Sequence, residues 1–262
     1  MFESEELIKM RAKLAGEAGA TYFQARKHDF QVMYQYLNPQ PGEHILGFWE
    51  GNCVFCKAIA EAVGSQGKYL VSDPSAYLLE RLKSRFPMPQ VEVLVSSSEE
   101  LDLPAESLDK AWSFGTFHDA LSQTQVVANI YKALKPGGLL FLADVFQGTS
   151  ASKFLDYTVS KYREGGHEAK LLSEEFADSL CFINGFKREK FHIVHLPQKW
   201  YFETENDIAV FLYKTFAMNL FPGDEPEKIK QTRERLREFL EIESSGEMYE
   251  LTWPMKAIMA EK

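Results

Sequence analysis

The sequence predicts an α/β fold built on a doubly wound, mainly parallel sheet of seven strands. Short apolar segments suited to buried strands alternate with helical segments over most of the chain. Strands that follow one another through helices in this way are parallel, and the helices cover both faces of the sheet. The 262 residues are enough for one large domain of this kind with an elaboration.

The chain begins with a helical extension, expected over residues 1–37. From about Glu5 to Leu37, apolar and aromatic residues recur at helical spacing, and Gly16 and Gly19 predict a break between two helices. Asn38, Pro39, Pro41 and Gly42 then end the second helix. We expect these helices to cover the functional site.

The core of the fold is expected over residues 38–203 and supplies most of the strands. Pro74 lies near the first turn of its predicted helix, where a missing N–H costs nothing. The helix before the fifth strand is expected to end at Pro136-Gly137-Gly138. The first five strands are HILGFW, KYLVSD, VEVLVSS, SLDKAWSFG and LLFLADV, and the helices between them include CVFCKAIAEAVG, PSAYLLERLKSRF and QTQVVANIYKALK.

The chain after Asp144 is less regular. We expect helices over 150–165 and 172–183, an alternating strand at FKREKFHIVHL, a helical insertion over 204–246, and a final strand of the core sheet over 247–262. Aromatic residues in and before the insertion are spaced to pack inward, which favours a core role over a pocket lining. They are Trp200, Tyr201, Phe202, Phe211, Tyr213, Phe216 and Phe221.

The composition excludes several classes of protein. A formal net charge of −9 argues against nucleic-acid binding, which needs clustered Lys and Arg. No apolar run approaches the ~20 residues that span a bilayer, and the acidic, amphipathic start does not resemble a signal peptide, so we expect a cytoplasmic protein with no membrane span. Three cysteines suggest free thiols, and a lone Cys53-x-x-Cys56 is weak support for a metal or redox site. We therefore expect no metal.

The candidate site lies where the carboxyl ends of the parallel strands meet. Ligands of open α/β sheets bind outside these ends, at the point where the strand order reverses. This places one crevice among segments that follow the predicted strands: Trp49 to Cys53, Asp73, Ser96 to Ser98, Phe114 to His118, and Asp144.

Residues from Gln40 to Asp144 resemble the Rossmann-like core of the class I S-adenosylmethionine-dependent methyltransferases, in particular the subgroup of ubiquinone and menaquinone biosynthesis. The likeness covers the strand–helix cycles of the first part of the chain, and its sharpest match is the Lys-Pro-Gly-Gly before the fifth strand. The segments that carry it are PGEHIL, GSQGKYLVSDPSAYLLERLKSRF, ELDLPAESLDKAWSFGTFHDAL and ALKPGGLLFLADV.

The resemblance implies S-adenosylmethionine as cofactor and suggests how strand-end residues hold it. Asp73, followed by Pro74, would accept hydrogen bonds from the two ribose hydroxyls, although Asp73 also suits the N-cap of the next helix. Ser97 and Ser98 lie where the family contacts adenine, and they equally suit an ordinary loop. Phe114 and Gly115 would flank the methionine part.

The resemblance aligns His118 with the first histidine of a pair that lies near the acceptor substrate in the family. A neutral imidazole there could take a proton from a hydroxyl or amine as it attacks the methyl group. The other interpretation is that this histidine only packs or hydrogen-bonds to the main chain. No other residue is proposed as catalytic.

The loop after the first strand departs from the family. In the family this loop has an acidic residue, then two variable residues, then Gly-x-Gly-x-Gly. In this chain residues 47–53 read GFWEGNC, and Gly51 is the one residue that matches a glycine of that pattern. The indole of Trp49 either turns into the protein or fills the space of the methionine part. Glu50 could supply the missing carboxylate. We assign Trp49, Glu50 and Gly51 to cofactor binding.

Three functions follow from these patterns. The first is an S-adenosylmethionine-dependent methyltransferase that transfers a methyl group directly to a small-molecule acceptor. The second is a protein of the same fold that uses the cofactor for a reaction other than methylation. The third is a non-catalytic binding protein of this fold. The protein could form a homodimer, which the sequence does not decide. The sequence also does not specify the acceptor.

Overall fold

The structure is a computed structural model that describes residues 4–48, 55–197 and 199–262, apart from the side chains at 29 and 245. The chain forms two compact units, each built from three stretches. The first unit comprises Met1–Val32, Val145–Ala169 and Leu196–Met255. The second comprises Met33–Asp144, Lys170–His195 and Lys256–Lys262, and it contains the predicted strand–helix cycles.

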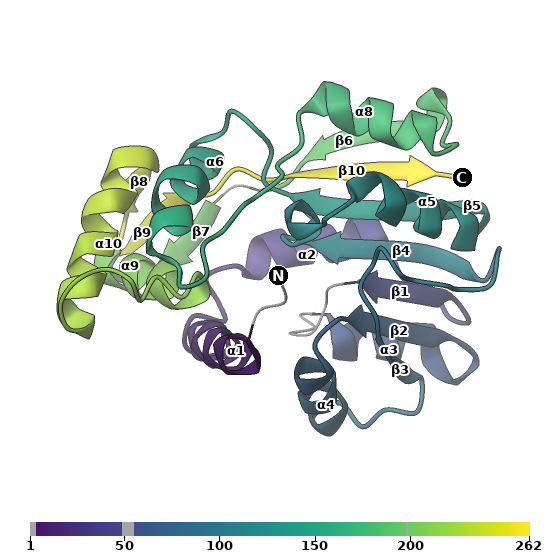
Figure 1. Cartoon of the computed structure of the whole chain (residues 1–262), viewed down its shortest axis with the longest axis horizontal. Coiled ribbons are helices and arrows are strands. Elements are labelled where there is room, and N and C mark those ends of the chain that lie inside the picture. Colours follow the sequence, from purple (N-terminus) through teal and green to yellow (C-terminus); the bar gives the residue numbers. More distant parts are fainter. Residues whose placement is uncertain (1–3, 49–54, 198) are drawn as a thin grey trace. The chain divides into compact units, whose positions relative to one another are not determined.

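The second unit is built on a seven-stranded sheet of order β3-β2-β1-β4-β5-β10-β6 (Figure 1). The first five strands of the chain run parallel to one another, and β10 pairs antiparallel with both β5 and β6. The strands are β1 (His44–Phe48), β2 (Lys68–Asp73), β3 (Val91–Val95), β4 (Leu108–Phe114), β5 (Leu134–Asp144), β6 (Phe191–His195) and β10 (Lys256–Glu261). This confirms the predicted fold class.

The central strands of the sheet carry apolar side chains, which pack into the core of the unit. Ile45 and Leu46 of β1 are fully buried, as is Trp112 of β4. The indole of Trp112 stacks on Phe55 at 5.0 Å between ring centroids and donates a 3.2 Å hydrogen bond to the hydroxyl of Tyr69. Its one polar atom is therefore satisfied inside the core, as a buried indole requires.

Helices join these strands, and serine side chains begin three of them. Ser75, Ser122 and Ser173 cap α4, α5 and α8, each accepting a main-chain N–H three residues further on. Figure 1 shows α5 and α8 on the near face of the sheet. The helices of this unit are α3 (Cys56–Val63), α4 (Ala76–Arg85), α5 (Gln123–Ala133), α8 (Glu174–Ile183) and the last turns of α2 (Lys27–Leu37).

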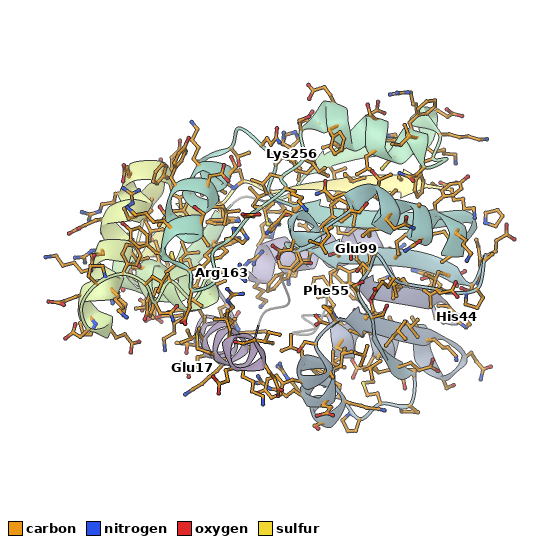
Figure 2. All side chains as sticks on the ribbon, viewed as in Figure 1. Glu17, His44, Phe55, Glu99, Arg163 and Lys256 are labelled. Carbon is orange, nitrogen blue, oxygen red and sulfur yellow. The ribbon has the colours of Figure 1, made fainter. Side chains whose placement is uncertain are left out.

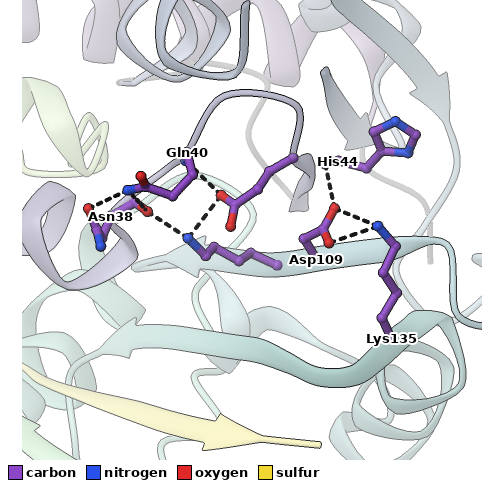
Figure 3. Close-up of polar contacts among 7 residues, drawn as sticks. Asn38, Gln40, His44, Asp109 and Lys135 are labelled. Carbon is purple, nitrogen blue, oxygen red and sulfur yellow. Dashed lines mark hydrogen bonds and ion pairs between the residues drawn. The ribbon is translucent and has the colours of Figure 1, made fainter. Parts of the chain in front are cut away.

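A polar network ties together the amino-terminal ends of β1, β4 and β5 (Figure 3). Asp109 accepts the main-chain N–H of His44 at 2.8 Å and the ammonium of Lys135 at 2.7 and 2.8 Å. Lys110 donates to Glu43 at 2.9 Å and to the carbonyl of Asn38. Figure 2 shows His44 at this end of the sheet and Phe55 and Glu99 at the other.

The first unit combines helices with a small antiparallel sheet of order β7-β9-β8. Its strands are β7 (Lys199–Phe202), β8 (Ile242–Ser245) and β9 (Met248–Thr252). Its helices are α1 (Glu5–Thr21), α6 (Ser150–Phe154), the π-helix η3 (Leu155–Val159), α7 (Ser160–Tyr162), α9 (Glu205–Thr215) and α10 (Glu225–Phe239).

An aromatic core holds this first unit together. Trp200 stacks on Trp253 with ring centroids 5.2 Å apart, and Phe211 meets Trp200 edge-on at 5.8 Å. Of the seven aromatic residues that the sequence marked for the core, five are buried, Tyr201 is 39% exposed, and Phe216 has intermediate exposure. The core interpretation therefore holds for most of them.

Three sequence expectations about local structure are wrong. α1 runs through Gly16 and Gly19, because about 1 kcal/mol per glycine is too little to interrupt a helix of 17 residues that Ser4 caps. Pro74 precedes the cap of α4 and does not lie in its first turn. β5 begins at Leu134, so Pro136-Gly137-Gly138 lies inside this strand, with a register shift against β4.

The expected final strand over 247–262 is two strands in two sheets. Met248–Thr252 pairs with β7 and β8, whereas Lys256–Glu261 lies between β5 and β6. Trp253-Pro254 separates them, and Pro254 has no N–H to continue a ladder. Within the described ranges, no helix has the length and apolar character needed to cross a membrane.

Candidate functional site

The carboxyl ends of β1 to β5 meet at one edge of the sheet. The chain leaves β1 toward β2 and β3 on one side, and β4 and β5 lie on the other side, so the strand order reverses between β1 and β4. Ligands of open α/β sheets bind at such a point. The described residues that the sequence predicted for the site end or follow β2, β3 and β4 at this edge.

Asp73 is the last residue of β2 and is only 7% exposed. Its Oδ1 accepts the main-chain N–H of Ser75 at 2.8 Å. The N-cap of α4 is Ser75 and not Asp73, so the capping alternative for this carboxylate is wrong. A carboxylate offers about four acceptor positions, and the place of this one at the carboxyl end of β2 suits recognition of a vicinal diol. Pro74, next along the chain, is exposed.

Ser97 and Ser98 follow β3 in a loop that α5 holds in place. Asn129 of α5 donates to the carbonyls of Ser98 and Glu99 at 3.2 and 2.7 Å. The carboxylate of Glu99 in turn accepts the main-chain N–H of Leu121 at 2.7 Å. These contacts fix the loop against the segment that follows β4.

The two serine hydroxyls differ in their surroundings. Ser97 Oγ lies 3.2 Å from a carboxylate oxygen of Glu100 and can donate its proton there. Ser98 is fully buried, and its Oγ makes no hydrogen bond within the part of the chain that the structure describes. A buried hydroxyl without a partner costs about 1–3 kcal/mol, and Ser72 Oγ of β2 is in the same situation within the described residues.

Phe114 ends β4, and Gly115 follows it with φ +65°, a conformation that glycine adopts without strain. The N–H of Gly115 donates to the carbonyl of Ala143 at 2.8 Å, which fixes the turn against β5. A Cβ added to Gly115 would meet no described atom within 4 Å. Among the described residues, nothing therefore crowds the main chain at Gly115.

His118 pairs with Asp144, the last residue of β5. The Nδ1 of His118 lies 2.8 Å from Oδ1 of Asp144, and the main-chain N–H of His118 donates to Oδ2 at 3.1 Å. Both side chains are buried. His118 lies in the short 3-10 helix η2 (Phe117–Asp119), which follows β4 directly.

Trp49, Glu50, Gly51 and Cys53 lie outside the described residues. Of the remaining predicted site residues, Asp73, Ser98, Phe114, Gly115 and His118 lie in the second unit at the carboxyl ends of the parallel strands, and Pro74 and Ser97 lie beside them.

Two residues that support this site were not assigned a role from the sequence. Asp144 stood in the predicted crevice, since it ends a strand, but its partner was not specified. Lys170 gave no signal, because a lysine in an irregular segment follows no periodic pattern; its main-chain N–H donates to the carbonyl of His118 at 2.9 Å.

The sheet order and the site together define the class of fold, the Rossmann-like fold of S-adenosylmethionine-dependent methyltransferases. Residues 50–142 match the family model of the methyltransferase domain. A solved S-adenosylmethionine-dependent methyltransferase of Thermotoga maritima superposes with a TM-score of 0.62 at 17% identity, over 99% of this chain and 100% of that one.

Two curated proteins are similar in sequence. One is an uncharacterised 37.1 kDa protein of a transposon in Streptomyces fradiae, 27% identical over 131 residues, 50% of this chain. The other is the ubiquinone/menaquinone biosynthesis C-methyltransferase of Hydrogenovibrio crunogenus, 26% identical over 110 residues, 40% of this chain. The matches span 38% and 43% of these relatives' own lengths. The family match is confined to residues 50–142, and the solved structures show that the fold is that of methyltransferases.

Proposed function

We propose that this protein is an S-adenosylmethionine-dependent methyltransferase that transfers the methyl group directly to a small-molecule acceptor. The observation that carries the proposal is the edge of the sheet, where Asp73 ends β2 and Ser98 and Gly115 follow β3 and β4, on both sides of the switch point. A carboxylate at a strand end suits recognition of a vicinal diol, and the carboxyl edge of a parallel sheet is where such folds bind nucleotides.

Each residue has a distinct role in this proposal. Asp73 accepts from the ribose hydroxyls, Ser97 and Ser98 contact adenine, and Phe114 and Gly115 border the methionine part. Trp49, Glu50 and Gly51 are proposed to complete the cofactor site, and Pro74 lies beside it. When bound, the cofactor supplies a methyl group on a positively charged sulfur, which an acceptor atom can attack. His118 takes the acceptor's proton.

A small acceptor agrees with the charge of the chain. The net charge of −9 disfavours a polyanionic substrate such as a nucleic acid, because phosphate contacts need clustered cations. Alignment of the acceptor with the methyl group is then the main contribution of the protein, since it turns a bimolecular step into an effectively unimolecular one.

Titration calorimetry with S-adenosylmethionine and S-adenosylhomocysteine tests cofactor binding. We expect dissociation constants near micromolar, and Asp73→Ala should weaken binding by about 10- to 100-fold, since one charge-assisted hydrogen bond is worth about 1.5–3 kcal/mol. Asp102→Ala is the matched control, because it removes a carboxylate that is 91% exposed in the same unit. No heat at millimolar ligand would exclude the proposal.

A second experiment separates methyl transfer from other uses of the cofactor. The protein is incubated with S-adenosylmethionine alone, and the products are measured. We expect S-adenosylhomocysteine to accumulate only when an acceptor is added. Turnover of the sulfonium without any acceptor would favour a reaction other than methylation.

A further inference from the structure

Helix α8 exposes an apolar face in the second unit. We propose that this face is the contact through which two copies of the chain form a homodimer, with the two α8 helices antiparallel across a two-fold axis. The α8 face comprises Glu175, Phe176, Ser179, Phe182 and Ile183, all of them exposed. The inference concerns assembly and does not depend on the proposed reaction.

The spacing of the α8 face places its residues on one side of the helix. They recur at intervals of three and four, whereas Leu180 and Cys181 are buried on the other side. Phe176, Phe182 and Ile183 are 48%, 52% and 65% exposed. Single exposed apolar side chains are ordinary, but three of them on one face of a short helix favour a contact with another protein.

The ring of Phe182 is held in place without any partner. The guanidinium of Arg188 lies 4.5 Å from the centroid of this ring and forms an ion pair with Asp178, one turn before Phe182. The helix ends at Asn184, whose side chain donates a 2.8 Å hydrogen bond to the carbonyl of Leu180. An ordered side chain loses less conformational entropy on binding, which favours a contact through Phe182.

The α8 face is complementary to a rotated copy of itself. A two-fold axis between antiparallel helices brings together residues that lie at equal distances before and after the axis. With the axis at Ser179, Phe176 lies three residues before it and Phe182 three residues after it. Phe176 of each copy then meets Phe182 of the other, and the small side chain of Ser179 lets the helices approach at the axis.

The charges at the two ends of α8 also suit an antiparallel copy. The helix begins with Glu174 and Glu175, and residues 187–190 after it read KREK, so one end is acidic and the other carries net positive charge. Glu174 forms an ion pair with Lys256, whereas Glu175 and Lys187 are exposed and suit a contact between copies. A parallel copy would set like charges together, which disfavours that orientation. We therefore infer a second copy as the occupant of this face.

The sheet ends beside this helix. Figure 1 shows α8 and β6 together at one margin of the seven-stranded sheet. Among the described residues, β6 pairs with β10 on one side and with no strand on the other. An unpaired strand edge is a common place for contact with another chain, and no further strand of this sheet obstructs the approach of a second copy there.

Sedimentation equilibrium of the full chain tests the proposal. We expect the wild-type protein to reach twice the 30.0 kDa mass of one chain. Ile183→Glu places a charge in the contact, so we expect the dissociation constant of the dimer to rise at least about 100-fold. The matched control is Val95→Glu, since Val95 is 57% exposed on β3, at the other edge of the same sheet, and this variant should dimerise as wild type does. A wild-type monomer at millimolar concentration, or an equally stable dimer in Ile183→Glu, would overturn the proposal.

Charge reversal tests the antiparallel orientation. Glu175→Lys and Lys187→Glu each set like charges together twice in the dimer, so each should raise the dissociation constant by about two- to tenfold. The double variant restores opposite charges and should dimerise within about twofold of wild type. If the two effects add in the double variant instead, the antiparallel contact is wrong. Both side chains are exposed, and circular dichroism checks that the variants keep the fold.

Discussion

The hydroxyl of Tyr22 donates a 3.0 Å hydrogen bond to Oδ1 of Asp207, which lies 185 residues further along the chain. Within the first unit this contact joins the end of α1 to the start of α9. The ring of Tyr22 packs against Phe202 and Phe211, with centroids 5.8 and 5.9 Å away. The tyrosine therefore connects the N-terminal helix to the aromatic core of the unit through both its ring and its hydroxyl.

Replacing Tyr22 by Phe removes the hydrogen bond and keeps the ring. We expect the free energy of unfolding to fall by about 1 kcal/mol, the net value of one hydrogen bond, because Asp207 still accepts from Thr204. Urea unfolding measures the change. Tyr201→Phe in the same unit is the control, and a loss of equal size there would show that the contact with Asp207 is not the cause.

The same pair predicts how stability responds to alkaline pH. Burial, the hydrogen bond to Asp207 and the charge of Asp207 together raise the pKa of Tyr22 to about 12. An unfolded tyrosine has a pKa of about 10, so the contribution of Tyr22 is fully present below pH ~10 and is lost as the pH rises toward 12. The gap in stability between wild type and Tyr22→Phe should narrow over that range. Parallel stability curves would contradict this.

Asp109 predicts the opposite dependence at acid pH. Burial of its carboxyl raises the pKa, but the N–H of His44 and the ammonium of Lys135 outweigh burial, so the net pKa lies below its usual value. The stabilisation is present above pH ~4 and is lost as the pH falls through the lowered pKa. We expect Asp109→Asn to cost about 1 kcal/mol at pH 7 and almost nothing near pH 2. Urea titrations at both pH values measure the difference, and Asp102→Asn, at an exposed ion pair, should have little effect at either.

Local patterns explain which parts of the fold were predictable. The alternation of strands and helices located β1 to β5, and KYLVSD coincides with β2 from Lys68 to Asp73. The sheet β7-β9-β8 was missed because β7 pairs with β9 from a distant part of the chain, and the apolar pattern from Met248 onward continues past Trp253. The local hairpin of β8 and β9, which turns at Gly246-Glu247, was included in the predicted helical insertion and the final strand. Which sheet a strand joins depends on such distant partners and not on its own sequence.

The candidate site was predictable in part, for a related reason. Asp73, Gly115 and His118 were found because strand ends mark the ligand-binding edge of a parallel sheet. The pairing of His118 with Asp144 could not be derived, since it depends on a distance between residues that follow different strands. The cofactor roles of Asp73, Ser97, Ser98, Phe114 and Gly115 stay predictions.

Gly115→Ala tests whether the cofactor lies against the main chain at the end of β4. The substitution costs about 1 kcal/mol of stability, because alanine resists a φ of +65°, and its methyl group meets no described atom within 4 Å. We expect the affinity for S-adenosylhomocysteine, measured by calorimetry, to fall at least tenfold. Gly137→Ala is the control, since Gly137 has φ +80° and open surroundings at the opposite edge of the sheet. If both variants lost affinity equally, the loss in Gly115→Ala would come from backbone strain and not from contact with the cofactor.

Ser98→Ala gives changes of opposite sign in stability and in binding. Because Ser98 Oγ is buried and makes no hydrogen bond among the described residues, its removal should raise the free energy of unfolding of the ligand-free protein by up to about 1 kcal/mol. If the hydroxyl contacts adenine, the same change should weaken S-adenosylhomocysteine binding about five- to tenfold.

The control for this variant is Ser72→Ala, since Ser72 Oγ is also buried and lacks a partner within the described chain. Ser72 lies within β2, before the strand end, so its loss should raise stability and leave the affinity unchanged. Thermal unfolding without ligand and calorimetry with S-adenosylhomocysteine give the two quantities. An affinity of Ser98→Ala equal to that of wild type would remove this hydroxyl from the adenine contact, because a buried donor that meets a ligand cannot be deleted without loss.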